Sequence, residues 1–351
     1  MNRIVLFLLS IGWFGFANAQ QELQTNFSNS KDSLYYDPLG DYLTLKFLVT
    51  NKYSDFEIND ALLNQTLVYK SKPSNAIGFG AAYRWLNFSL SLGLKNRSDS
   101  VDETKRSIDF QTAIYMRRLT INLYSGIYTG YYLENSAKMI TDWDDNDNYH
   151  YVRNDITTNT FGVGFSYLFN SEKYSNKSSF VQKEWQKKTA GSFLTGGSII
   201  RNEVRADSSF IPTNISDSNF YKGIDFNHSS LFKVGAEGGY AFTYVLKEHF
   251  FFNFSVLAGI SYGKTKLTPL IDEEISAMEL NFTLLNSAGF GYNSKLFFVG
   301  FNYTNLFSKT PSPIQDMNLG YSSGKFQLVA AYRFKIPEHK SILPAWIPIQ
   351  L

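Results

Sequence analysis

The feature that most constrains this chain is a strict alternation of apolar and polar residues along many separate segments. In the clearest segment the even-numbered residues from Phe250 to Tyr262 are apolar or aromatic, whereas the odd-numbered residues from Asn253 to Gly263 are mostly small or polar. A period of two residues places alternate side chains on opposite faces of a β-strand. The same pattern recurs around Leu90 and Leu123. An all-β fold is therefore predicted.

These segments are too long for an ordinary soluble sandwich, whose strands average about five or six residues. Crossing a bilayer at a tilt takes roughly nine to eleven residues, which most of the segments reach. None of the nine prolines, which cannot donate to a strand ladder, lies inside a segment. We predict a closed antiparallel transmembrane β-barrel of about 12 strands. The segments are 42–51, 75–84, 86–97, 105–117, 118–131, 155–169, 189–205, 231–246, 249–264, 277–292, 295–308 and 324–335.

The connections between the segments alternate in length. Short turns are predicted near residues 85, 117–118, 247–248 and 293–294, and longer polar loops at 52–74, 98–104, 132–154, 206–230, 265–276 and 309–323. Outer-membrane barrels have short periplasmic turns and long extracellular loops. One connection breaks the rule: residues 170–188 are long and polar where a periplasmic turn is expected, and we expect a short helix there.

Both ends of the chain are expected to lie outside the barrel. Residues 1–19 combine Arg3, an apolar stretch and the small residues Ala17 and Ala19, which is typical of a cleaved signal peptide. The predicted organisation continues with a periplasmic N-terminal segment at 20–41, the barrel at 42–335 and a periplasmic tail at 336–351. No run of eighteen apolar residues follows residue 19, so no transmembrane helix is expected.

Composition narrows the class of partner. The chain holds 31 Phe and 23 Tyr, which a barrel can place outward against lipid. Its formal net charge is only +2 and it has no basic stripe, so no nucleic-acid partner is expected. The absence of cysteine argues against a lipid anchor and against disulfides.

Four stretches together resemble one family. They are residues 43–53 (LTLKFLVTNKY), 75–83 (NAIGFGAAY), 128–132 (YTGYY) and, most specific, 180–194 (FVQKEWQKKTAGSFL). They are similar to the uncharacterised outer-membrane barrel family of Bacteroidetes numbered 4421 among the domains of unknown function. The resemblance covers nearly the whole mature chain and implies a barrel in the cell outer membrane, but no activity. A more distant likeness is to barrel subunits of the type IX secretion and gliding machinery.

No catalytic, cofactor-binding or metal site is predicted. The acidic run at 142–148 has oxygen ligands at alternate positions but lacks the glycine and the glutamate of a calcium loop. A solvated loop, or a cation loosely shared with lipopolysaccharide, accounts for it better. None of His150, His228, His249 and His339 is placed beside a serine on the lipid-facing wall, which argues against a lipid hydrolase. The Gly-x-Gly pairs at 78/80, 162/164 and 289/291 lie within strands with no helix following.

The lumen-facing polar candidates are Lys46, Asp109, Lys233 and Glu237. A Lys or Arg in the hydrocarbon costs ~2–4 kcal/mol at mid-depth, so charges on the polar phase should face inward. Lys95, Arg117, Glu279 and Arg333 share this phase. Because bulky residues such as Tyr124 and Leu257 also point in, a mostly plugged lumen is favoured over an open pore.

Side-chain directions follow from the alternation. Phe254, Leu90, Leu123 and Phe301 are predicted to face lipid, and Asn253, Ser89, Asn122 and Asn302 the lumen. Aromatic belts are expected at both interfaces. Tyr83, Tyr167, Tyr244, Tyr292 and Tyr332 should lie at the periplasmic rim, and Tyr131, Tyr262 and Tyr303 nearer the outside.

Three functions remain open from the sequence. The first is a structural or interaction barrel, such as a subunit of an envelope assembly, with loops 132–154 and 206–230 as docking surfaces. The second is a narrow channel for small solutes, and the third a lipid-modifying enzyme, although no enzymatic activity is expected. The expected partners are outer-membrane lipid and lipopolysaccharide, the barrel-assembly machinery during insertion, and other envelope proteins.

Overall fold

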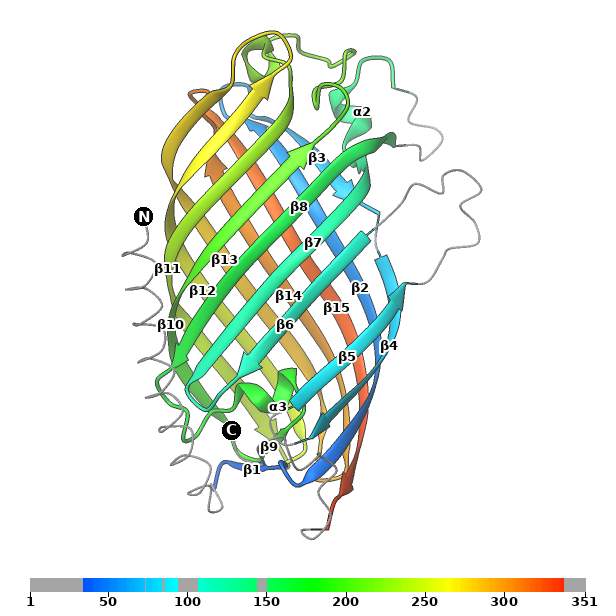
Figure 1. Ribbon diagram of the computed structural model, residues 1–351, viewed down its shortest axis with the longest axis vertical. Helices are drawn as coiled ribbons and strands as arrows, with labels where there is room; N and C mark the ends of the chain where they lie inside the picture. The colour runs from blue at the N-terminus through cyan, green and yellow to red at the C-terminus, as the bar shows by residue number, and fades with distance from the viewer. Residues whose placement is uncertain (1–33, 73, 84–85, 94–106, 144–149, 338–351) are drawn as a thin grey trace, which may run out of the picture.

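The chain folds into an antiparallel barrel, seen in a computed structural model that describes residues 34–72, 74–83, 86–93, 107–143 and 150–337 (Figure 1). Ten strands form its closed ring, in the order β2-β3-β7-β8-β10-β11-β12-β13-β14-β15 and back to β2. The predicted class, an all-β closed antiparallel barrel, is confirmed, and each of the twelve predicted segments overlaps one strand. No helix of the described residues is long and apolar enough to cross a membrane.

The strands are long and tilted, as Figure 1 shows. Their bounds are β1 Tyr36–Pro38, β2 Tyr42–Asp60, β3 Gln65–Ser71, β4 Ser74–Tyr83, β5 Leu86–Gly93, β6 Ser107–Tyr115, β7 Leu119–Leu133, β8 Tyr151–Leu168, β9 Glu184–Gln186, β10 Ala190–Arg205, β11 Phe226–Leu246, β12 Phe250–Pro269, β13 Ile275–Asn293, β14 Phe297–Pro311 and β15 Met317–Lys335. The helices are short: α2 Ser136–Met139, α3 Asn176–Phe180 and the 3₁₀ turn η2 Phe220–Gly223. We call the end of the short turns the lower end, and the opposite end the upper end.

The ring closes through a strand that the sequence reading missed. Residues 52–74 were predicted to be a loop, which is wrong: β2 continues to Asp60 and returns as β3. At the upper end β3 lies between β2 and β7, pairing with β7 over Tyr69 to Ser71. Toward the lower end, β2 pairs with β4 and β7 pairs with β6 instead. The lower strands were recognised by apolar residues on their outer face. In the upper part of β2 the apolar residues are on the inner face instead, so the prediction missed this continuation of the strand.

Strands β4, β5 and β6 extend the sheet at the lower end and are attached to the ring through β2 and β7. β5 pairs with β4, and β6 pairs with β7. Within the part of the chain that the structure describes, β5 and β6 do not pair with each other, and Figure 1 shows a space between them. Residues 87–92 of β5 are consequently exposed on both faces, including Ser89, which was predicted to face the lumen.

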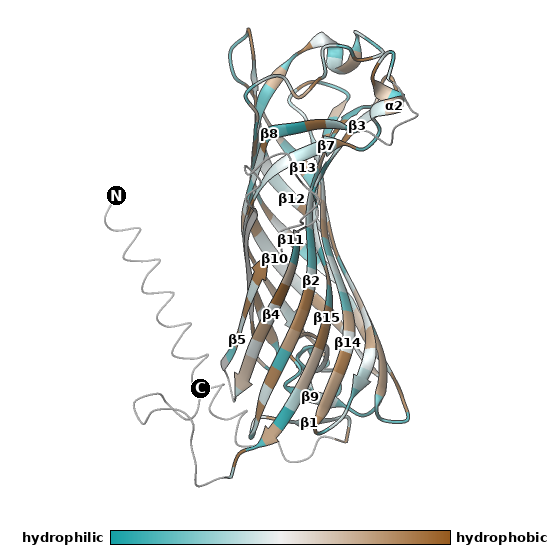
Figure 2. Ribbon diagram, turned by 90° about the vertical axis from the view of Figure 1, so that its right-hand side faces the viewer, coloured by the Kyte–Doolittle hydropathy of each residue, from teal (hydrophilic) through white to brown (hydrophobic). Residues whose placement is uncertain are grey.

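The outer surface of the lower half is apolar. Phe254 is 46% exposed on β12, whereas its neighbour Asn253 is buried. Figure 2 shows the apolar residues concentrated in this half. Along β12 the band runs from Phe250 to Tyr262, about 40 Å of strand, which at a 45° tilt is about 28 Å in height. A continuous exposed apolar band of this height matches the hydrocarbon core of a membrane.

The upper half has the opposite arrangement. Its interior is a hydrophobic core that we call the cap: Phe56, Ile58, Leu67, Tyr69, Tyr128, Tyr131, Leu133, Met139, Ile140, Ile156, Val204, Phe210, Ile211, Phe220, Tyr221, Phe226, Leu231, Leu267, Ile314, Met317, Leu319 and Tyr321. Part of this core comes from the 206–225 connection, through Phe210 and Phe220. This connection was predicted to be an open polar loop, but its aromatic residues close the upper end of the barrel.

One predicted member of the outer aromatic belt is wrong. Tyr131 is fully buried in the cap, and its hydroxyl lies 2.5 Å from that of Thr158. The register of β7 against β8 shifts between Thr129 and Tyr131, and Gly130 takes a φ of 88°. This bulge adds one residue to β7 and turns the following side chains inward, which simple alternation cannot foresee.

The other belt residues lie near the predicted heights. Tyr83, Tyr167, Tyr244, Tyr292 and Tyr332 fall within three residues of the lower ends of β4, β8, β11, β13 and β15. Tyr262 is exposed at the upper edge of the band, and the Tyr303 hydroxyl lies 3.2 Å from that of Tyr53. The predicted turn between β11 and β12 is present as Lys247 and Glu248, both with positive φ, as a tight type I′ hairpin requires.

Candidate functional site

The lower mouth of the lumen is filled by residues 170–188, which we call the plug. It contains α3 and β9, and β9 pairs with the N-terminal strand β1 to form a separate two-stranded sheet. Figure 1 shows these elements at the bottom of the barrel. The side chain of Ser175 caps α3 by accepting from the Ser178 amide at 3.2 Å. The short helix expected in this odd connection is therefore present, but folded within the barrel mouth.

Two basic lumen residues bind the backbone of the plug. Lys46 donates to the carbonyl of Val181 at 2.7 Å and to Asn87 Oδ1 at 2.9 Å. Arg333, fully buried, donates to the carbonyl of Gln182 at 2.8 and 3.1 Å and to Asn293 Oδ1 at 3.0 Å. A charged donor satisfied by carbonyls that no strand uses is a strong anchor in a site shielded from water. The sequence placed both charges in the lumen, but not against this segment.

Glu184 is the acidic centre of the plug. Its carboxylate lies 3.1 Å from the Arg117 guanidinium and also accepts from the Ser175 hydroxyl. Asn293 donates to the Glu184 carbonyl at 3.1 Å, so strand and plug are joined on both sides. Arg117 also stacks over the ring of Tyr36 in β1, 4.0 Å from its centroid. The plug is thus tied to the barrel wall and to the N-terminal strand at once.

The amines of the plug titrate in an environment that disfavours charge. Burial lowers the pKa of Lys183 to about 7, with a further contribution from Lys177, while Glu184 opposes the shift. Burial likewise lowers the pKa of Lys177. The backbone of Lys183 is fixed from both sides, because its amide donates to Lys177 and its carbonyl accepts from Leu39.

Above the plug the lumen is lined by polar side chains. Lys233 is buried and donates to Thr283 Oγ1 at 2.7 Å and to the hydroxyl of Ser308. Glu237 accepts from Ser198 Oγ at 2.5 Å. Asp109 lies in β6 opposite Gly126. Lys95 lies outside the described residues.

A row of amides crosses the lumen wall. Asn253, Gly289 and Asn302 are paired in register on β12, β13 and β14, and the row continues through Gln327 to Thr50. Both amide atoms of Asn253, together with Oδ1 of Asn302, are buried without a hydrogen-bond partner. Buried amides of this kind normally bind water or a solute, because leaving them unsatisfied is costly.

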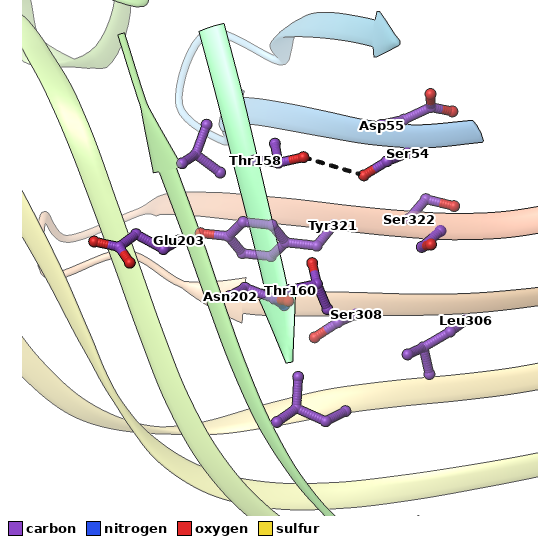
Figure 3. A pocket seen from close by; sticks show the side chains of 13 residues that line it. Ser54, Asp55, Thr158, Thr160, Asn202, Glu203, Leu306, Ser308, Tyr321 and Ser322 are labelled. Carbon is purple, nitrogen blue, oxygen red and sulfur yellow. Dashed lines mark hydrogen bonds between the residues drawn. The ribbon is translucent and has the colours of Figure 1, made fainter. Parts of the chain in front are cut away.

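A cavity lies in the lumen between Lys233 and the cap (Figure 3). Seven of its thirteen lining residues carry hydroxyl groups, and the Ser54 and Thr158 hydroxyls lie 3.5 Å apart. The carboxylates of Asp55 and Glu203 point away from these hydroxyls in Figure 3. The lining residues are Ser54, Asp55, Thr158, Thr160, Ile200, Asn202, Glu203, Val204, Leu306, Ser308, Tyr321, Ser322 and Ser323. The sequence analysis did not predict this cavity, because its hydroxyls are spread over four strands.

The upper end is sealed by hydrogen bonds as well as by the cap. The Tyr69 hydroxyl donates to the carbonyl of Phe210, and the Tyr221 amide donates to Asp60 Oδ2 at 2.9 Å. Arg153 bridges from β8 to the carbonyl of Ser209 at 2.6 Å. The 206–225 connection is therefore fixed across the upper mouth.

The remaining candidates from the sequence are scattered. The ring of His249 stacks between those of Trp185 and Tyr292 at the lower rim, and His228 lies 3.1 Å from Glu203 on the outer face. His150 packs against Tyr132. His339, the predicted signal peptide (residues 1–19) and residues 144–148 of the acidic run lie outside the described residues. Among the residues that are described, no three His, Cys, Asp or Glu side chains are grouped to hold a metal ion.

Comparison with protein families gives one match. A model described as a domain of unknown function (DUF4421) matches residues 30–334, which is nearly the whole of the predicted mature chain. A search of curated proteins found no match.

Solved structures resemble the chain only distantly. The outer membrane protease OmpT from Escherichia coli is 10% identical with a TM-score of 0.36, covering 85% of this chain and 98% of that one. The translocator domain of the autotransporter NalP from Neisseria meningitidis is 8% identical with a TM-score of 0.31, covering 93% and 97%. Ail, the attachment invasion locus protein of Yersinia pestis, is 10% identical with a TM-score of 0.19, covering 83% and 99%. Scores this low have no bearing on function.

Proposed function

The chain belongs to the DUF4421 family, and we propose that it is an outer-membrane barrel with a closed lumen that serves as a structural or interaction subunit of an envelope assembly. In this proposal the lower end faces the periplasm, the upper end faces outward, and residues 1–19 are a cleaved signal peptide. The chain would come from a bacterium of the Bacteroidetes. Its partners would be lipid and lipopolysaccharide, the assembly machinery during insertion, and other envelope proteins.

The observation that carries the proposal is the plug. Arg333, Lys46 and Asn293 bind its backbone from three strands, so moving it aside breaks several charge-assisted hydrogen bonds at once. A buried donor left without its partner costs about 1–3 kcal/mol, more when it is charged. The cap blocks the other mouth with a hydrophobic core. A pathway for solutes would have to disrupt both.

Conductance across a planar bilayer tests the closed lumen. The wild-type protein should show no steady ion current. A variant that combines replacement of residues 173–187 by a Gly-Ser linker with Phe56→Ala in the cap should conduct, because both closures are then weakened. In the same Phe56→Ala background, the double variant Lys46→Gln with Arg333→Gln keeps the full chain and serves if the deletion does not fold. Arg118→Gln is the matched control, because Arg118 is exposed beside Arg117 at the same rim. Steady current through the wild type would overturn the proposal.

A narrow channel is the second candidate, favoured by the polar lumen between plug and cap. The cavity hydroxyls and the unpartnered amide of Asn253 form an interior that can hold water. In that case the plug would be a gate, and Lys233 and Glu237 would bias the passage of ions. The same bilayer recording distinguishes the two, because a gated channel opens in the wild type and a scaffold does not.

A lipid-modifying enzyme is the third and weakest candidate, and the proposal includes neither enzymatic activity nor a cofactor. Release of fatty acid from phospholipid vesicles by the purified barrel, abolished by a single substitution, would reverse that part of it.

A further inference from the structure

Four basic residues lie on the outer face of β10 and β12, directly above the apolar band. They are Arg201, Arg205, Lys264 and Lys266, which we call the basic patch. All four lie on the outward phase of their strands: Arg201 and Arg205 are more than 60% exposed, and Lys264 is also exposed. They face away from the lumen, so neither the plug nor the cavity explains them.

The position of the patch along the strands is set by their register. Arg201, Phe232 and Lys264 occupy one row across β10, β11 and β12. Strands are about 4.8 Å apart, so the backbones that carry Arg201 and Lys264 lie about 10 Å from each other, one on each side of the exposed Phe232. One outward step below this row lie Ile199 and Tyr262, both at least half exposed. The patch is therefore the first row of charge above the apolar band.

Much of the positive charge in the patch is not neutralised by the protein. Glu203 accepts from Arg205 at 2.8 Å and lies 3.1 Å from His228, and Lys266 pairs with Glu274 at 2.6 Å. The Arg201 guanidinium lies 3.7 Å from the Glu203 carboxylate, which is a long distance for an ion pair. Lys264 makes no ion pair with any residue that the structure describes. Two acidic side chains thus face four basic ones, in addition to His228.

The excess of positive charge is not found on every part of the outer wall. On β2, beyond the apolar Leu45, Phe47 and Val49, the outward residues include the acidic Asp55 and Glu57. Lys70 of β3 lies opposite Asp55 in register, so acidic and basic residues are mixed there. The excess of basic residues beside β10–β12 therefore indicates an anion at that place.

We propose that the basic patch binds the phosphate groups of an anionic lipid in the outer leaflet. The apolar residues below it would contact acyl chains, while Arg201 and Lys264 lie at the depth of phosphates attached to those chains. A phosphorylated glycolipid with two phosphates fits two cations carried on strands about 10 Å apart better than a single free anion does. The inference rests on the proposed membrane location, but not on the closed lumen or on any partner protein.

Binding of diphosphorylated lipid A to the purified detergent-solubilised barrel tests the patch. The variant Arg201→Ser with Lys264→Ser should bind it about 10-fold more weakly, since each basic residue near a lipid surface contributes appreciably. Lys309→Ser is the matched control, because Lys309 is an exposed lysine on β14, on a different part of the outer wall. It should change the affinity less than about twofold.

The other arms identify what is bound. Phosphate-free lipid A should bind the wild type as weakly as diphosphorylated lipid A binds the double variant, and millimolar inorganic phosphate should not compete. Equal affinities of wild type and double variant, equal binding of the phosphate-free lipid, or full competition by inorganic phosphate would each overturn the inference. Heat-modifiable migration of every variant shows that the barrel is folded. A folded barrel that binds no lipid A contradicts the patch alone, whereas failure to insert into membranes contradicts the proposed location.

Discussion

The lower and upper halves of the barrel are built from the same strands with opposite polarity. In the lower half Leu45, Phe47 and Val49 of β2 point outward and Lys46 points into the lumen. In the upper half of the same strand, Phe56 and Ile58 point inward and Glu57 points outward. The phase of alternation does not change along β2; the chemistry of each face does.

The difference teaches that the solvent outside decides which face is apolar. Lipid surrounds the lower half in our proposal, so its outer face needs apolar residues and its lumen collects the polar ones. Water surrounds the upper half, which therefore packs a hydrophobic core inside, as a soluble protein does. On β12 the change falls between Tyr262 and Lys264, so the proposed membrane boundary lies within about two residues of this point.

The largest expected effect is in the upper half. Phe56 is fully buried, with its ring 5.4 Å from that of Phe210 and 5.5 Å from that of Tyr321. Phe56→Ala should destabilise the cap by about 3–5 kcal/mol. Cleavage of the 206–225 connection by an added protease should accelerate accordingly. Phe47→Ala, which truncates a lipid-facing ring of the same strand, should leave this cleavage unchanged; equal acceleration would refute the soluble-like core.

The lower half should fail when charge enters its outer face. Phe254→Arg places a cation in the apolar band, at a cost of ~2–4 kcal/mol if it lies near mid-depth. The fraction of protein recovered folded from lipid vesicles should fall. Thr268→Arg makes the same charge on the same face of β12 above the boundary and should insert normally. Similar losses for both variants would mean that the boundary is misplaced.

The join between the halves on β7 depends on one glycine. Gly130 has a φ of 88° at the bulge that turns Tyr131 into the cap. Gly130→Ala should cost about 1–2 kcal/mol, because a side chain is strained in this region. The loss of stability should lower the midpoint temperature of thermal unfolding. Gly40→Ala, where nothing lies within 4 Å of an added Cβ, is the control and should have no effect.

The smallest effect concerns pH at the plug. The pKa of Lys183 falls from 10.5 to about 7 in the folded plug, so between these values only the released plug binds the extra proton. Attachment is therefore weakest below about pH 7 and strengthens as the pH rises toward 10.5. The positive charge of Lys177 also lowers the pKa of Lys183, whereas the carboxylate of Glu184 raises it. Burial lowers the pKa of Lys177 itself, so it contributes a pH dependence of the same sign. The other cations that contact the plug are Lys46 and Arg333.

Protease cleavage within residues 170–188, at matched protease activity between pH 7 and pH 10, measures how often the plug is released. Cleavage should slow as the pH rises, and Lys183→Met should flatten the trend. Cleavage that accelerates at high pH would contradict the assigned direction.

The sequence by itself determined the barrel, its strand segments and the direction of most side chains. Period two repeats over lengths that only a bilayer crossing requires, so Phe254 and Asn253 could be assigned to opposite faces without coordinates. It also showed that residues 170–188 did not behave as a turn. The inward direction of Lys46, Lys233 and Glu237 followed from the same alternation. When one face of a strand is apolar and meets lipid, the polar residues on the other face must point into the lumen.

Only the tertiary structure decided how the ends are closed. The contacts of Arg333 with Gln182 and of Lys46 with Val181 join residues more than 130 positions apart, and they use backbone carbonyls, which carry no sequence signal. The bulge at Gly130 and the reversal of polarity above Tyr262 depend on neighbouring strands and on the surrounding solvent. Alternation reports which residues share a face, but what that face meets is set by parts of the chain that are distant in sequence.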